Sequence, residues 1–487
     1  MKSIRHILFT FCLLTLMACN NFEELNQNPN EPTTVSAGVL FSSAIRTSLQ
    51  TSSNEAFLLS NNIAQLTAKT LRAEVDFYGW NAFPTVWEGL YESLTDLNNA
   101  IEIAQAEENY KMEGALMVMQ AWVYSQLTNA YGDIPYSEAM EGLTANFTPV
   151  YDRQEAIYAD LLARLTQASV KLADSGNIQG DILYQGEATA WIKFSNSLRL
   201  RLLMYASTKR DVANDFAQIV TDGMIFSNNE EQAVLGFLSS FPNQFPTIPL
   251  KQGDFDAVAI STSAVDALQA TNDPRLSRYA RPDNLDFNAP SFTGVDNGVG
   301  GQTGSRLGLA FYDYPGQITA TEMGLSYADG ILMTYAEVEF LLAEAALNGW
   351  ISQDVETHYK RGVEASHAYY EVDYTPYGWT GFEHFYQNSG VAYTTGIDIW
   401  KEKWLSMYFT ALDPYFEVRR WYVAVDGWSG LPFLNRPIGT NANNYALPMR
   451  FLYPGQEQSL NADNYQEANN RYNVNKLING KMWIVSE

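Results

Sequence analysis

Few residues in the sequence have a type and spacing that could support catalysis or bind a metal ion. After residue 18 the histidines are His358, His367 and His384, and their intervals of nine and seventeen residues match no pair of metal ligands on one helix. The sequence contains no Walker phosphate loop, no GxSxG nucleophile motif and no HExxH zinc motif. We therefore predict no catalytic residue, no metal ion and no cofactor.

Paired carboxylates keep one enzymatic alternative open. Glycoside hydrolases use two acidic side chains whose separation in space, rather than along the chain, defines the site. With 55 Asp and Glu residues, the sequence leaves a helical glycoside hydrolase as an alternative. Most of these acids are expected to be solvated surface groups.

Aromatic residues are unusually frequent. The 11 Trp, 29 Tyr and 25 Phe make up 13% of the chain, against 17% for all charged residues. Flat rings accompanied by amides complement the C–H faces and hydroxyl groups of sugars.

The formal charge of −25 argues against a nucleic-acid partner, which requires a basic face. A hydrophobic content of 46% is enough for a large core.

The N-terminus has the pattern of a lipoprotein export signal. Lys2 and Arg5 precede an apolar run at 7–16, which is too short to span a membrane permanently. Residues 16–19 read Leu-Met-Ala-Cys, a lipobox in which the Cys19 thiol receives a lipid before cleavage. We predict a signal peptide at 1–18 and lipidation, including palmitate, at Cys19.

The body of the chain reads as helical. The polar, proline-broken stretch 19–34 is predicted to be a tether, and 35–487 a single α-helical domain. Irregular excursions are expected near 237–325 and 427–454, where Pro and Gly are frequent. Apolar residues recurring with a period near 3.6 predict helices at 35–50, 55–71, 85–105, 111–130, 153–173, 187–206, 328–347, 355–370 and 395–408.

Several stretches together resemble one protein family. Residues 129–139 read NAYGDIPYSEA, and four other stretches agree in order along the chain: FEELNQNPNEPTT at 22–34, NDPRL at 272–276, YAEVEFLLAEAA at 335–346 and YFEVRRW at 415–421, followed by MRFLYP at 449–454. This set resembles the SusD/RagB family of outer-membrane nutrient-binding lipoproteins, and most of all the SusD-like branch whose ligands are poorly defined.

The resemblance implies a fold and a function. The fold would be mostly α, with about four tetratricopeptide-like helix pairs and an irregular, loop-rich insert. The protein would be anchored by lipid to the outer membrane, facing the cell exterior. It would bind glycan oligosaccharides and deliver them to a TonB-dependent (SusC-like) outer-membrane transporter. The family is not known for enzymes, oligopeptides are an alternative cargo, and a purely structural lipoprotein is a further alternative.

The resemblance also indicates where a ligand would bind. Family members use exposed aromatic rings, helped by Arg and Asn, on loops beside the helix pairs. The matching loop here is 76–83, where Gly79 and Pro84 break the helix and would let rings project freely. The predicted ligand contacts are Tyr78, Trp80, Asn81 and Phe83 on this loop, and Tyr312 and Tyr314 in the irregular insert.

The remaining motifs have structural interpretations. Trp87, in the helix after the loop, is predicted to be a core residue. Gly132 is expected to end the preceding helix in the left-handed conformation. Arg419 and Arg420 are predicted to form buried ion pairs with Glu417 and with Glu337 or Glu344.

The lipobox yields the first testable prediction. Cys19→Ala should release the protein from the membrane fraction, because the acyl chains at this residue supply the anchor. Labelled palmitate incorporated into cells measures the modification, and fractionation measures the anchoring. Equal labelling of the variant and the parent would contradict the assignment.

Overall fold

The computed structural model describes residues 35–238, 243–247, 252–308, 329–472 and 474–486. The predicted signal peptide, Cys19 and the tether lie outside these residues. No helix within the described residues is both long enough and apolar enough to cross a membrane.

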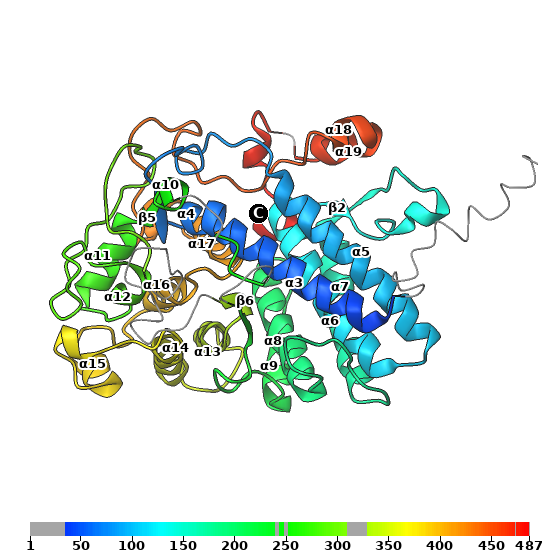
Figure 1. The fold of residues 1–487 in the computed structure, drawn as a ribbon, viewed down its shortest axis with the longest axis horizontal. Coiled ribbons are helices and arrows are strands. Elements are labelled where there is room, and N and C mark those ends of the chain that lie inside the picture. The colour runs from blue at the N-terminus through cyan, green and yellow to red at the C-terminus, as the bar shows by residue number, and fades with distance from the viewer. Residues whose placement is uncertain (1–34, 239–242, 248–251, 309–328, 473, 487) are drawn as a thin grey trace, which may run out of the picture.

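Paired helices form the body of the molecule, as Figure 1 shows. In three of the pairs the two helices follow one another in the chain, and in the first pair the short α4 (Asn61–Ile63) lies between them. Within the described residues the four pairs of this body are α3 (Ala37–Glu55) with α5 (Pro84–Ala106), α6 (Tyr110–Tyr131) with α7 (Gln154–Leu172), α8 (Ala188–Ala206) with α9 (Ala213–Asp222), and α13 (Tyr335–Leu347) with α14 (Val355–Tyr369). The predicted mostly α fold with about four helix pairs is therefore confirmed.

Side-chain caps fix where several of these helices begin. The Ser36 hydroxyl accepts from the Val39 amide at the start of α3, and Thr334 caps α13 through the Glu337 amide. Pro84 occupies the first turn of α5, where its missing N–H costs nothing. Helix α6 is buried along almost its whole length because α5, α7, α8 and α17 (Asp413–Ala424) surround it.

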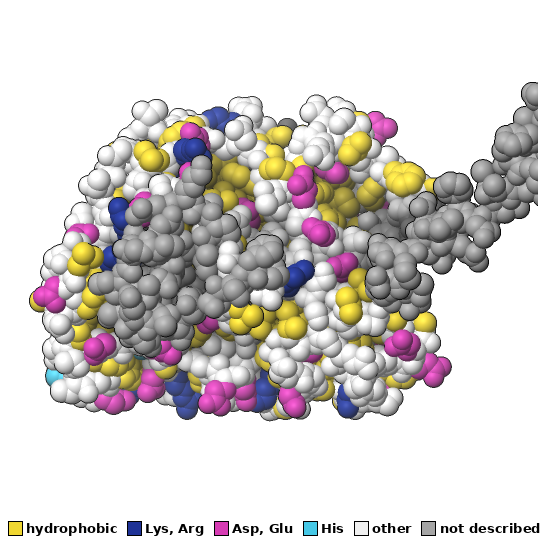
Figure 2. All heavy atoms as spheres, viewed as in Figure 1, with side chains coloured by type: hydrophobic (Ala, Val, Ile, Leu, Met, Phe, Trp, Pro, Cys, Tyr) yellow, Lys and Arg dark blue, Asp and Glu magenta, His cyan; other side chains and the backbone are white. Residues whose placement is uncertain are grey.

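Short elements complete the chain between and after the pairs. Three two-stranded antiparallel sheets join β1 (Thr67–Lys69) to β5 (Val258–Ile260), β2 (Ile134–Pro135) to β3 (Tyr151–Asp152), and β4 (Ala233–Gly236) to β6 (Asp329–Met333). The other helices are α4 (Asn61–Ile63), α10 (Gln252–Phe255), α11 (Thr262–Ala270), α12 (Leu276–Tyr279), α15 (Phe382–Asn388), α16 (Gly396–Ser406), α18 (Glu457–Leu460) and α19 (Ala462–Asn470). On the face drawn in Figure 2, acidic and basic side chains are interspersed with scattered hydrophobic patches.

The helix predicted at 55–71 is wrong beyond its first half. A π-helical turn at Ala56–Ser60 leads into α4, which ends at Ile63, and the chain then forms β1. Asn62 explains the break, since its side chain donates to the Phe57 carbonyl and accepts from the Thr67 hydroxyl, both at 2.9 Å. Such local bonds compete with helical backbone bonds, and pairing with β5 stabilises the strand.

Two other boundary predictions need correction. The helix predicted at 328–347 begins as strand β6, and α13 starts only after the Thr334 cap. Gly132 does have a positive φ of 86°, but its ψ of −119° lies outside the left-handed helical region. A Cβ there would lie 2.2 Å from the Tyr472 hydroxyl, so close packing also requires glycine.

A buried ion network joins the second, third and fourth helix pairs. Arg201 of α8 donates from Nε and Nη2 to the two carboxylate oxygens of Glu337 on α13, both at 2.6 Å. Its Nη1 lies 3.2 Å from Asp413 Oδ2, at the start of α17. Gln126 of α6 donates to the other Asp413 oxygen at 3.1 Å. All three charged side chains are at most 1% exposed.

The predicted arginine pairs are confirmed for Arg420 and wrong for Arg419. Arg420 donates to Glu344 at 2.8 Å and lies 2.7 Å from Glu417, which also accepts from Lys403. Arg419 instead donates to two backbone carbonyls, those of Asn129 and Met449. These bonds tie α17 to the end of α6 and to the C-terminal segment.

The network predicts a large effect of removing one member. Arg201→Met should lower the free energy of unfolding by about 3–5 kcal/mol, because two buried carboxylates lose their cation. Chemical denaturation measures this change. The matched control is Arg199→Met, since Arg199 is half-buried two residues away and, within the described ranges, its side chain donates only to Asn196. An Arg201→Met loss of no more than about 1 kcal/mol would contradict the role of the network.

Candidate functional site

Two of the aromatic residues predicted to contact a ligand, Tyr78 and Trp80, are buried in the structure. Tyr78 is 2% exposed and Trp80 is 8% exposed, so the prediction that they project freely from a loop is wrong. Trp87 is also 8% exposed, which confirms that it is a core residue. Gly79 does not end a helix, because α4 already stops at Ile63, and Pro84 begins α5. The residues just before Pro84 pack onto the body.

Trp80 is held in a cluster of rings. Its indole N–H donates to the Val75 carbonyl at 3.0 Å, and its ring meets those of Phe83 and Phe451 at centroid distances of 5.5 Å. Tyr415 of α17 lies at 5.8 Å. These edge-on contacts supply a packing reason for Trp80 that the loop sequence alone does not reveal.

The other residues predicted to contact a ligand differ in their exposure and in whether the structure describes them. Phe83 is half-buried against Phe451, whereas Asn81 is exposed. Tyr312 and Tyr314 lie outside the described residues. None of the four loop residues lines a cavity described below.

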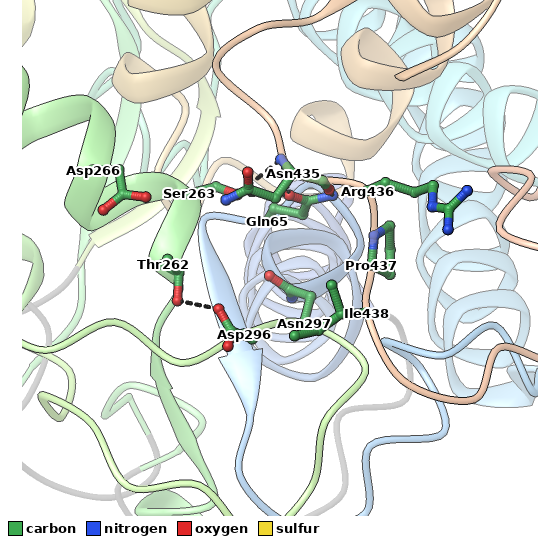
Figure 3. Close-up of a pocket in the computed structure, with 10 residues that line it drawn as sticks. All are labelled: Gln65, Thr262, Ser263, Asp266, Asp296, Asn297, Asn435, Arg436, Pro437 and Ile438. Atoms are coloured by element: carbon green, nitrogen blue, oxygen red, sulfur yellow. Dashed lines mark hydrogen bonds between the residues drawn. The ribbon is translucent and has the colours of Figure 1, made fainter. Parts of the chain in front are cut away.

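A cavity lies instead between α11 and the segment 435–438 (Figure 3). This first cavity has a volume of about 370 Å³, within the range of small-ligand sites. Four parts of the chain, far apart in sequence, line it: Gln65, then Thr262, Ser263 and Asp266, then Asp296 and Asn297, and finally Asn435, Arg436, Pro437 and Ile438.

Asn297 is fixed by bonds behind the cavity. Its Nδ2 donates to the carbonyls of Asn62 and Thr67 at 3.0 and 2.9 Å, and lies 3.3 Å from Asp76 Oδ2. Because the nitrogen is committed, the amide oxygen is left as an acceptor, and among the described residues it has no donor. Asn297 therefore offers a preoriented acceptor to a ligand.

Gln65 and Ser263 fix the opposite wall. The Asn435 amide donates to Gln65 Oε1 at 3.0 Å and to the Ser263 hydroxyl at 3.1 Å, and Gln65 Nε2 donates back to the Asn435 carbonyl. With its backbone held in this way, the exposed side chain of Asn435 is left available. The close approach of the insert also needs Gly298, where a Cβ would lie 2.6 Å from the Ile438 carbonyl.

Charged groups lie at the ends of the cavity. The Asp266 carboxylate is exposed on α11 and, among the described residues, has no ion pair or hydrogen bond. Asp296 accepts from the Thr262 hydroxyl at 2.6 Å. At the other end, the Arg436 guanidinium stacks on Tyr445 at 4.1 Å from the ring centroid, and Figure 3 shows it extending away from Asp266.

A buried acid–base pair supports the cavity from behind. Asp76, fully enclosed, accepts from the Lys69 backbone amide at 2.8 Å. Burial raises the pKa of Asp76 to about 7, and burial lowers the pKa of Lys69 to about 8, each opposed by the charge of the other. The Asp76 carboxylate lies directly behind Asn297, whose Nδ2 is 3.3 Å from Asp76 Oδ2.

The arrangement is suited to binding a polar, uncharged ligand. Amide, hydroxyl and carboxylate groups converge on the cavity, and Thr262, Ser263, Asn297 and Asn435 carry no charge. Among the described residues, no group of three or more His, Cys, Asp or Glu side chains could hold a metal ion.

Comparisons with known proteins identify the family. A family model described as "Starch-binding associating with outer membrane" matches residues 29–454. The chain belongs to the SusD-like family. No curated protein matches the sequence.

Solved SusD-like structures share the fold. A SusD homologue from Bacteroides fragilis has 22% identity and a TM-score of 0.76, over 93% of this chain and all of its own. A structure named "chitin-binding protein" has 24% identity and a TM-score of 0.76, with the same coverage. A chitin-binding SusD homologue from Flavobacterium johnsoniae has 17% identity and a TM-score of 0.74, over 93% of this chain and 99% of its own. At these identities the likeness establishes the fold.

Sequence reasoning located the regions of this SusD-like cavity but not its residues. Nine of the ten lining residues fall in the two irregular stretches predicted at 237–325 and 427–454. The tenth, Gln65, falls in the helix that was wrongly predicted at 55–71. The sequence carries only a weak signal for these residues, because Asn, Ser and Asp are common in irregular stretches whether or not they line a cavity.

Because Trp80 packs in a cluster of rings, we expect its removal to lower the stability of the fold. The sequence alone predicts that its removal weakens ligand binding. Trp80→Ala should lower the free energy of unfolding by about 3–5 kcal/mol, because it leaves a cavity among four aromatic neighbours. Thermal and chemical melts measure the loss, with Phe147→Ala as the control because Phe147 is 73% exposed. A Trp80→Ala protein with unchanged stability but weakened ligand binding would restore the original expectation.

Proposed function

We propose that this SusD-like protein binds glycan oligosaccharides at the outer cell surface and delivers them to a partner TonB-dependent outer-membrane transporter. The observation that carries the proposal is the first cavity, in which a preoriented Asn297 acceptor faces a wall held by Gln65, Ser263 and Asn435. Preorganised polar groups reduce the ordering cost of binding a flexible ligand.

The chemistry of the cavity favours a neutral sugar over an acidic one. Sugar hydroxyls both donate and accept, so they can use an amide oxygen, an amide nitrogen and a carboxylate together. The free Asp266 carboxylate would accept from a sugar hydroxyl but would repel a uronic acid, as would the overall charge of −25. The family description names starch, and two of the similar structures are named for chitin.

Observations outside the cavity support the anchoring of the protein to a membrane and the delivery of its ligand to a transporter. The lipobox at Cys19 supports attachment to a membrane, and the family description supports association with the outer membrane. Family membership supports the proposal of a transporter partner. An oligopeptide remains the alternative cargo, since amide groups also pair with peptide backbone.

Substitutions in the cavity test the proposal. The double variant Asp266→Ala/Asn435→Ala should weaken the binding of neutral oligosaccharides about tenfold or more, the effect of losing about 1.4 kcal/mol of contact energy. Isothermal titration with starch-derived and chitin-derived oligomers measures the affinity. Both side chains are exposed and unbonded within the described residues, so the melting temperature should not change.

The controls separate binding from folding and from catalysis. Gln269→Ala changes an exposed residue of α11 that does not line the first cavity, and it should keep parental affinity. Oligosaccharides should keep their length after prolonged incubation with the protein. Parental affinity of the double variant would exclude this site, and accumulation of shorter sugars would favour the hydrolase alternative.

A further inference from the structure

A second cavity adjoins the first. It has a volume of about 340 Å³ and shares Ser263, Asp266 and Asn435 with the first cavity, so the two are continuous along α11. Its remaining lining residues are Ala267, Ala270, Ile397, Asp398, Lys401, Pro432 and Phe433. Five of these seven are apolar, which distinguishes it from the largely polar first cavity.

Phe433 forms a supported aromatic surface in the second cavity. Its ring is half-buried and meets Trp404 at a centroid distance of 5.4 Å and Trp421 at 6.2 Å. Trp404 and Trp421 are both fully buried, and Trp421 stacks on Trp400 at 5.8 Å. Because rings behind it fix its position, Phe433 loses little conformational freedom when a ligand packs on it.

The charged residues of the second cavity are already engaged. Asp398 accepts from the Thr394 hydroxyl and from the Thr395 amide, in the capping box of α16. Although partial burial opposes the effect, these bonds hold the pKa of Asp398 below its usual value. Lys401 lies 3.5 Å from the buried Glu402. Both of these charges are compensated. Asp266, which has no ion pair in the described part of the chain and lies at the junction with the first cavity, therefore dominates the polar chemistry.

We propose that the second cavity is a further sugar subsite, so that the site takes a linear oligosaccharide spanning both cavities and passing Asp266. This inference rests on the proposed function. One unit of the chain places its hydroxyls against Asn297 and Asn435 in the first cavity. A following unit lays its C–H face on Phe433, and Asp266 accepts from a hydroxyl near the linkage between them.

Length dependence of binding tests the inference. In titrations of the parent with maltose-series and chitobiose-series oligomers of two to six units, affinity for the series that binds should rise about tenfold or more with length and then level off. Ala270→Trp should abolish this rise while leaving the affinity for the shortest binding oligomer unchanged, because a large ring would fill only the second cavity. Ala270 is exposed, so this substitution should not disturb the core.

Matched variants make each outcome decisive. Gln269→Trp places the same ring on the neighbouring exposed position, outside both cavities, and should preserve the length dependence. Phe433→Ala should reproduce the Ala270→Trp result if it remains folded by thermal melting. Affinity that does not change with length, or a rise that survives Ala270→Trp, overturns the second subsite but leaves the proposed function standing. Failure of both series to bind at any length overturns both.

Discussion

The buried guanidinium of Arg201 is the interaction on which the helical body most depends. It bridges Glu337 on α13 and Asp413 at the start of α17, and its Nη2 also donates to the Leu332 carbonyl at the end of β6. Trp122 of α6 donates to the same carbonyl. A charge removed from water needs a counter-charge and hydrogen-bond partners, so the contacts of Arg201 favour one relative arrangement of these helices. Burial disfavours the charged form of Asp413. It raises the pKa of this carboxyl to about 7, although the charge of Arg201 opposes the shift.

That arrangement extends to the ligand cavities through a short series of bonds. Just before Asp413, the Ala411 carbonyl accepts from the Ser60 hydroxyl, and the Phe409 amide donates to Asn61. The Trp404 indole donates to the Ala64 carbonyl, which immediately precedes Gln65. The π-helical turn and α4 are therefore held against the start of α17. The same tryptophan supports Phe433, so one set of buried contacts positions both cavities.

The sequence predicts the helical body well because its signals are local and repeated. A period near 3.6 places α6, α7 and α8 to within about two residues of their observed ends. It cannot show that Trp80 is buried, because the rings that cover it, Tyr415 and Phe451, lie more than 300 residues away in the chain. Nor can it show the cavities, because four distant segments meet at the first cavity and three at the second. The helix break at Asn62 is predictable only in part. Its cause is a pair of local side-chain hydrogen bonds, which an Asn at this position can form but does not have to form.

Together these features describe a rigid helical scaffold that presents a groove built from irregular segments. The central claim is that a neutral oligosaccharide binds in this groove between α11 and the segment 432–438. A crystal structure of the protein with a bound oligosaccharide tests it most directly. The account predicts sugar units on both sides of Asp266, with one hydroxyl donating to Asn297 Oδ1 and one ring packed on Phe433. Sugar bound elsewhere on the molecule, with the groove filled only by water, would contradict it.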